Sequence, residues 1–132
     1  MRFVVDTHVL VWWVNEPERL TIALAGALST ASAESPLGVP DIVLWEIATL
    51  VSLGRLTPTL PLMDWLSRAT AAPLVRVIAI NPAIAAEVAA LPEGFHRDPG
   101  DRLIVATARV LGLPLLTVDR RIRDSGLVHV VG

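Results

Sequence analysis

The chain has 132 residues, a formal net charge of −2 and 53% apolar residues, and all 11 of its basic residues are arginine. This length suits one domain with a substantial core. The absence of cysteine excludes disulfides and thiolate metal sites, and the absence of lysine excludes phosphate-loop NTPases. No apolar run approaches the roughly 20 residues that a membrane span needs, so we expect no membrane association and a cytoplasmic location.

The first half of the chain alternates short apolar runs with helical patterns. In order, it predicts a buried strand over 2–6, helices over 7–14 and 18–32, a short strand over 37–40, and a helix over 41–54. Asp41 is the expected N-cap of the last of these helices, because a short acidic side chain can accept hydrogen bonds from the free N–H groups of a first turn. Gly54 is expected to end that helix.

The second half continues the same alternation. It predicts, in order, a helix over 61–72, a strand over 75–80, a helix over 82–91, an irregular stretch, a helix over 100–112, a strand over 114–118, a short helix over 119–124 and a last strand over 127–131. Strands that are joined through helices pair in parallel by right-handed crossovers. We therefore expect an α/β fold with a mostly parallel central sheet.

Four acidic residues, far apart in the sequence, adjoin these apolar runs. Asp6 and Asp119 stand at the carboxyl ends of two predicted strands. Asp101 lies in the first turn of the helix that precedes the second of those strands, and Glu46 lies about a turn and a half into its own helix. Ligands of parallel α/β sheets bind beyond the carboxyl ends of the strands, so we expect the four carboxylates to converge there.

Converging carboxylates would repel one another by a few kcal/mol per pair at an effective dielectric near 20. A divalent cation would remove this conflict, and oxygen ligands without thiolates or a histidine pair favour Mg²⁺ or Mn²⁺ over Zn²⁺. One or two such ions can support phosphodiester hydrolysis. Each acid alone also has a simpler explanation: Glu46 could be exposed, and the others could cap helices, namely Asp6, Asp98, Asp101 and Asp119.

Four blocks of sequence carry a more specific signal. They are Val5-Asp6-Thr7-His8, Trp45-Glu46-Ile47-Ala48 with Gly54-Arg55-Leu56 after it, the stretch from Phe95 to Ile104, and Leu116-Thr117-Val118-Asp119. Together they resemble the PIN-domain ribonucleases, in particular the VapC-type toxins of toxin–antitoxin modules. The resemblance covers nearly the whole chain and implies a single PIN-like nuclease domain over 1–132, with a three-layer α/β/α sandwich around the parallel sheet.

The resemblance also implies an activity, which is endonucleolytic hydrolysis of RNA phosphodiesters with a metal-activated water. The residues that would be catalytic and would hold one or two Mg²⁺ or Mn²⁺ ions are Asp6, Glu46, Asp101 and Asp119. The residues that would support them are Thr7, Asp98 and Thr117. Arg97 and Arg102 could contact RNA phosphates or pair with nearby carboxylates.

A protein partner follows from the same resemblance: a cognate small antitoxin would bind in a groove, and the chain would form a homodimer. The candidate partner contacts are Trp12 or Trp13, Leu53 and Trp65. Trp12 and Trp13 are adjacent and therefore cannot share one helix face. Trp65 lies on an amphipathic stripe and is expected in the core, with partner contact as the alternative that the resemblance implies.

Two other functions are open at this stage. A phosphotransferase or phosphatase could use Asp6 as its nucleophile, although the lysine that such sites ordinarily place beside the acids is missing. A non-catalytic interaction module would use the acids only as helix caps and would act through its apolar surface. The three histidines are expected to pack or to face solvent, and His96 is the one that adjoins Asp101 in sequence.

Overall fold

An entirely parallel five-stranded sheet forms the centre of the fold in the computed structural model, which describes residues 1–132. The strands are β1 (Val4–Val5), β2 (Leu37–Pro40), β3 (Val75–Ile78), β4 (Leu115–Leu116) and β5 (Val130–Val131), in the spatial order β3-β2-β1-β4-β5. Val5 pairs with Leu116 in the register of β1 and β4. The segments that follow these two central strands therefore leave the sheet side by side.

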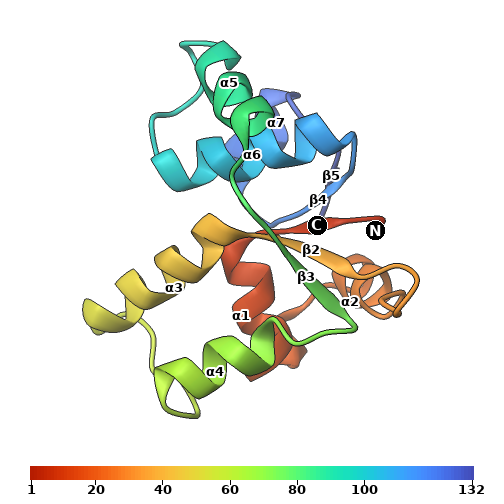
Figure 1. Cartoon of the computed structure of the whole chain (residues 1–132), viewed down its shortest axis with the longest axis vertical. Coiled ribbons are helices and arrows are strands. Elements are labelled where there is room, and N and C mark those ends of the chain that lie inside the picture. Colours follow the sequence, from red (N-terminus) through yellow and green to blue (C-terminus); the bar gives the residue numbers. More distant parts are fainter.

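Helices cover both faces of this sheet and give the expected three-layer α/β/α sandwich. They are α1 (Thr7–Asn15), α2 (Ile22–Leu28), α3 (Asp41–Ser52), α4 (Leu62–Ala69), α5 (Pro82–Ala90), α6 (Pro99–Leu111) and α7 (Arg120–Ser125), with a 3₁₀ turn over Pro17–Arg19. Figure 1 shows α1, α3 and α4 on one side of the sheet and α5, α6 and α7 on the other. No helix is both long and apolar enough to cross a membrane.

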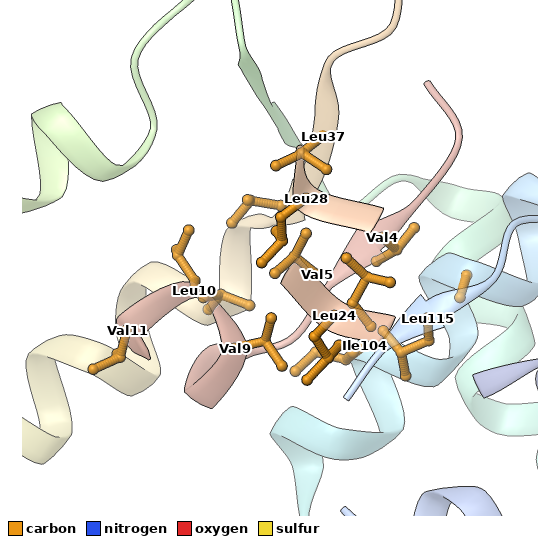
Figure 2. Packing of buried hydrophobic residues seen from close by; sticks show 14 of the residues in the cluster. Val4, Val5, Val9, Leu10, Val11, Leu24, Leu28, Leu37, Ile104 and Leu115 are labelled. Carbon is orange, nitrogen blue, oxygen red and sulfur yellow. The ribbon is translucent and has the colours of Figure 1, made fainter. Parts of the chain in front are cut away.

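The core occupies both faces of the sheet. Val4 and Val5 point to opposite faces because side chains alternate along a strand, and both are fully buried. Figure 2 shows Leu24 and Leu28 of α2, Leu10 of α1 and Ile104 of α6 packed around these strands, within a cluster of 23 buried apolar residues. Burial on both faces explains why the central strands are continuous apolar runs, and it fixes the position of the residues that follow them.

The expected long helix over 18–32 is wrong, because the structure divides this segment. Leu20 has an extended backbone, and Thr21 then caps α2 by accepting a hydrogen bond from the N–H of Leu24. At the other end the hydroxyls of Ser29 and Thr30 donate to backbone carbonyls of the last turn, where α2 stops. Side-chain hydrogen bonds of this kind compete with helix continuation.

Asp41 is not the N-cap of α3, as the sequence had suggested. It is the first residue of the helix, and Pro40 occupies the cap position. The Oδ2 atom of Asp41 instead accepts a hydrogen bond from the backbone N–H of Ile80. This long-range bond ties the start of α3 to the segment after β3. Gly54 does adopt the left-handed conformation after the helix, as expected, with φ of 70°.

Several other elements are shorter than the sequence suggested. The predicted helix over 61–72 ends at Ala69, where the hydroxyl of Thr70 donates to the carbonyl of Leu66. The predicted strands over 114–118 and 127–131 are paired over only two residues each. Beyond the two paired residues of β4, the N–H of Thr117 still donates to the carbonyl of Val131, and Val118 then leads out of the sheet to Asp119.

Candidate active site

A cavity of about 610 Å³ opens where β1 and β4 end. Residues from α1, α3, the start of α6 and the segment after β4 line it, and they include five carboxylates: Asp6, Glu46, Asp98, Asp101 and Asp119. All four acids that the sequence predicted to converge therefore face one cavity. The fifth, Asp98, was expected only as a supporting residue.

The tightest group of acids is Glu46, Asp98 and Asp101. Each offers an oxygen atom, and these oxygens lie within 4.8 Å of one another. Asp6 and Asp119 line the same cavity but stand outside this trio. The structure thus gives Asp98 a more central place than the sequence suggested.

Asp6 forms the floor of the cavity and is only 6% exposed. Its Oδ1 atom accepts a hydrogen bond from the N–H of Val9 and caps α1, and its Oδ2 atom accepts one from the hydroxyl of Thr117. Burial raises the pKa of Asp6 to about 6, even though both hydrogen bonds favour its charged form. Capping is therefore part of the role of Asp6, and it holds the carboxylate at the carboxyl end of β1.

Glu46 is oriented from two sides. The hydroxyl of Thr7 donates to its Oε1 atom over 2.7 Å. Gly100 approaches it from the start of α6, and a Cβ at that position would lie inside van der Waals contact with the carboxylate. Burial, followed by repulsion from Asp101 and Asp98, raises the pKa of Glu46 despite the hydrogen bond from Thr7. A residue without a side chain is thus what lets α6 bring its acids to Glu46.

Asp101 is held by the irregular loop before α6. Nε2 of His96 lies 2.6 Å from Oδ2 of Asp101. Arg102 fixes this loop by donating to the carbonyls of Phe95 and His96 and, across the loop, to that of Val88. Burial raises the pKa of Asp101, and repulsion from Asp98 and Asp119 adds to the effect, whereas the hydrogen bond to His96 opposes it.

Asp98 and Asp119 both cap helices, which is the simpler role that the sequence suggested for each of them. Oδ1 of Asp98 accepts from the N–H of Asp101 at the start of α6. Oδ1 of Asp119 accepts from the N–H groups of Arg121 and Ile122 at the start of α7, while its own N–H donates to the hydroxyl of Thr117. These caps occupy one oxygen of each carboxylate and leave the other free to act as a ligand.

The donor set of the cavity fits a hard divalent cation. It consists of carboxylate oxygens, with hydroxyls of Thr7 and Thr117 hydrogen-bonded to two of them. Three of the acids have raised pKa values, chiefly because burial disfavours their charged forms and also because neighbouring acids repel them. Such burial is costly unless a cation compensates it. Oxygen-only ligation suits Mg²⁺ or Mn²⁺.

The candidate partner contacts take different positions relative to the cavity. Trp65 is 1% exposed, and its Nε1 donates to Oδ1 of Asn15, so its assignment as a partner contact is wrong and it belongs to the core. Trp45 is 63% exposed and lines the cavity beside Glu46. Leu53 is 60% exposed and lines the same cavity with Trp12. Trp13 is half-buried against the core.

Neither of the two arginines that were candidate RNA contacts lines the cavity, and the contact of Arg97 with RNA stays a prediction. The guanidinium of Arg102 donates hydrogen bonds to three backbone carbonyls. Arg97 is exposed and lies outside the cavity. Arg55 and Arg121 line the cavity instead. Neither was selected from the sequence, although Arg55 lies within one of the four blocks and Arg121 follows Asp119 by two residues. That proximity to a predicted ligand was the available signal.

Comparisons with known proteins agree with this geometry. The sequence pattern of the PIN domain matches residues 3–126. The chain is 41% identical to Ribonuclease VapC22 of Mycobacterium tuberculosis (strain ATCC 25618 / H37Rv) over 119 residues. The aligned region covers 90% of this chain and 88% of that protein.

Solved structures show the same fold at low sequence identity. The structure of VapBC2 from Rickettsia felis, bound to a DNA fragment from their promoter, matches with a TM-score of 0.72 and 15% identity over 98% of this chain and 97% of that one. A toxin–antitoxin complex from Klebsiella pneumoniae matches with a TM-score of 0.65 and 18% identity over 98% and 95%. The chain therefore belongs to the PIN-domain family and, within it, to the VapC group.

Proposed function

We propose that this protein is a metal-dependent endoribonuclease and the toxin of a toxin–antitoxin pair. The observation that carries the proposal is the convergence of Glu46, Asp98 and Asp101 within 4.8 Å in a cavity that Asp6 and Asp119 also line. RNA as the substrate is supported by the 41% identity to a protein that is named a ribonuclease.

Glu46, Asp98 and Asp101 would hold the first Mg²⁺ or Mn²⁺ ion, and Asp6 and Asp119 would complete its shell or hold a second ion. When bound, such an ion lowers the pKa of a water molecule and offsets the negative charge that develops on the phosphodiester. The remaining tasks fall to the chain itself. Thr7 orients Glu46, and His96 orients Asp101.

Thr117 forms hydrogen bonds with both Asp6 and Asp119, the two acids that stand outside the trio. Its hydroxyl donates to Asp6 and its oxygen accepts from the N–H of Asp119, so one side chain sets the spacing of both. Thr117 is itself fully buried. Its contribution is therefore positional, since it does not reach the open part of the cavity.

The geometry speaks against Asp6 as the nucleophile of a phosphatase. Both of its carboxylate oxygens accept hydrogen bonds, and the residue is 6% exposed. A nucleophile needs an oxygen that can approach phosphorus in line. A role for Asp6 in holding a cation is compatible with these hydrogen bonds, because a carboxylate oxygen can accept more than one contact.

The antitoxin part of the proposal rests on the exposed apolar surface beside the acids. Trp45 and Leu53 are 63% and 60% exposed, and Trp12 borders the same cavity. Aromatic residues exposed at the edge of a pocket are typical of binding surfaces. A partner segment on this surface would cover the acids and block access to them. Homodimer formation stays a prediction, which light scattering coupled to size-exclusion chromatography would test.

The proposal is tested by incubating the purified protein with a mixed pool of structured RNAs in Mg²⁺ or Mn²⁺, with and without EDTA. Cleavage that EDTA abolishes and added metal restores is the expected result. Cleavage that persists in excess EDTA would contradict metal dependence. The absence of both cleavage and calorimetric metal binding would instead favour the non-catalytic interaction module.

A further inference from the structure

Arg55 and Arg121 are two cations within an otherwise acidic cavity. Arg55 lies just beyond the end of α3, and Arg121 lies in α7. Figure 1 shows α3 and α7 on opposite sides of the sheet, so the two arginines reach the cavity from different layers of the fold. The acids that follow β1 and β4 stand at the sheet between these layers.

Neither arginine is neutralised within the chain. The arginine–carboxylate ion pairs of the structure are Arg19 with Glu16 and Arg109 with Glu87, so neither Arg55 nor Arg121 takes part in one. The acids of the cavity are bonded to neutral hydroxyls, to backbone N–H groups and to His96. Arg55 and Arg121 are exposed and free to bind an external anion.

Arg121 also lines a neighbouring cavity of about 430 Å³. His96 borders that second cavity too, while its ring contacts Asp101 of the acidic one. Arg121 therefore stands at the boundary between the two cavities. A polymer that leaves the acidic cavity in this direction has to pass this side chain.

A nucleic-acid strand meets an electrostatic conflict at this site. Bound cations can compensate the acids and the phosphate at the cleavage point, but the phosphates on either side of it remain uncompensated. Arginine is well suited to such flanking phosphates, because its guanidinium forms paired hydrogen bonds with phosphate oxygens. Contacts of this kind set the register of the strand and do not depend on base sequence.

We propose that Arg55 and Arg121 each bind a backbone phosphate of a single-stranded RNA, one on either side of the acids, so that the strand crosses the acidic cavity and continues over Arg121 toward the second cavity. The inference rests on the proposed ribonuclease function and adds the path of the substrate. A single strand is specified because its flexible backbone can follow a path from Arg55 across the acids to Arg121 and the second cavity.

The experiment compares Arg121→Gln and Arg55→Gln with Arg120→Gln and Arg76→Gln. Arg120 is exposed in the same helix as Arg121 but does not line the cavity, and Arg76 is exposed on β3. Binding is followed by the initial fluorescence anisotropy of a labelled 20-nucleotide random single-stranded RNA in Ca²⁺, which takes the same oxygen ligands, at several NaCl concentrations. Cleavage of the same RNA in Mg²⁺ and calorimetric titration with Mn²⁺ complete the set.

Each of the two cavity variants is expected to weaken RNA binding about three- to tenfold. Each should also reduce the slope of log K against log [NaCl] by about 0.7, the value for one phosphate contact to a single strand. KM for cleavage should rise accordingly, while Mn²⁺ affinity is unchanged. The two control variants should match the wild type within about twofold in affinity, as expected for residues that make no phosphate contact.

Three results would contradict the inference, and each has a different meaning. If the wild type binds and cleaves RNA but Arg121→Gln and Arg55→Gln behave like the controls, the strand path is wrong while the ribonuclease function stands. If the wild type neither binds nor cleaves RNA although it binds Mn²⁺, the function and the path fail together. Weaker RNA binding with an equal loss of Mn²⁺ affinity would also contradict a direct phosphate contact.

Discussion

Nε2 of His96 lies 2.6 Å from Oδ2 of Asp101, and this contact joins the loop before α6 to the candidate metal centre. The other ring nitrogen, Nδ1, is buried and has no hydrogen-bond partner. A proton on Nδ1 would therefore be unsatisfied, so the geometry assigns the proton to Nε2, which donates it to Asp101. His96 thus acts as a positioning residue for a ligand, in the manner of the outer partners of other metal sites.

Replacement of His96 by Ala should lower Mn²⁺ affinity and cleavage about tenfold, because loss of an outer partner of a metal ligand typically costs 10- to 100-fold. His96→Gln should recover part of the loss, since an amide can also donate to Asp101. Calorimetry and cleavage rates measure both effects. His129→Ala is the matched control, because His129 is exposed and lies outside the cavity. Equal Mn²⁺ affinity in His96→Ala and the wild type would show that Asp101 does not need this bond.

Gly100→Ala should displace the carboxylate of Glu46, because the new Cβ would overlap it. The side chain of Glu46 can rotate away, so we expect weaker metal binding and slower cleavage with a melting temperature close to that of the wild type. Gly26→Ala offers a control, as a Cβ there meets nothing within 4 Å. Undiminished cleavage by Gly100→Ala would mean that the observed position of Glu46 is not required.

The metal-free protein should lose stability as the pH rises from about 5 to 7.5. Burial raises the pKa of Asp6 from 3.8 to about 6, so the folded state retains a proton that the unfolded state has already lost. The stabilisation by protonated Asp6 is complete below the unfolded value and disappears as the pH passes through about 6. Between pH 5 and pH 7.5 the corresponding change in the free energy of unfolding is about 1.4 kcal/mol, because the rest of the effect is already lost below pH 5.

Thermal unfolding in EDTA at pH 5 and pH 7.5 measures this effect, and Asp6→Asn should show a smaller change between the two. The raised pKa values of Glu46 and Asp101 act in the same direction. Added Mg²⁺ should therefore raise the melting temperature more at pH 7.5 than at pH 5, since the cation binds the ionised acids. A wild type whose stability in EDTA is higher at pH 7.5 than at pH 5, with Asp6→Asn changing in parallel, would refute the account.

Trp45→Ala should weaken binding of the cognate antitoxin by tenfold or more, because an exposed aromatic anchor at an interface commonly contributes about 2 kcal/mol. Stability should change little, as Trp45 is 63% exposed. Surface plasmon resonance with the purified antitoxin measures the affinity. Met63→Ala is a suitable comparison, since Met63 is 81% exposed and does not line the cavity. Wild-type affinity in Trp45→Ala would place the partner elsewhere.

Much of this fold could be predicted from the sequence, because apolar runs buried on both faces, helical periodicity and strand-end acids are local patterns. The strand Leu37–Pro40 and the convergence of four acids on one cavity are examples. The prediction of one helix over 18–32 was wrong. The alanine-rich composition of this segment favours helix throughout, whereas an extended Leu20 and hydroxyl side chains limit the helix locally.

The parts that could not be predicted depend on which face of an element meets the rest of the molecule. Trp45 and Trp65 both lie in helices among apolar neighbours, yet one faces the cavity and the other the core. Arg102 was selected for its nearness to Asp101, but its long side chain turns back to the loop carbonyls. The direction in which each of these side chains faces depends on tertiary contacts, which the spacing of residues in the sequence does not encode.

Whether the acidic cavity is the active site is measured by cleavage of a structured RNA pool in Mg²⁺ by Asp101→Asn, the wild type and Asp64→Asn. Asp64 is exposed on α4 and lies outside the cavity, so its variant makes the same chemical change without touching the candidate site. The account predicts that the wild type and Asp64→Asn cleave RNA alike, while Asp101→Asn remains folded and inactive. Wild-type cleavage by a folded Asp101→Asn would contradict the assignment of the acidic cavity as the active site.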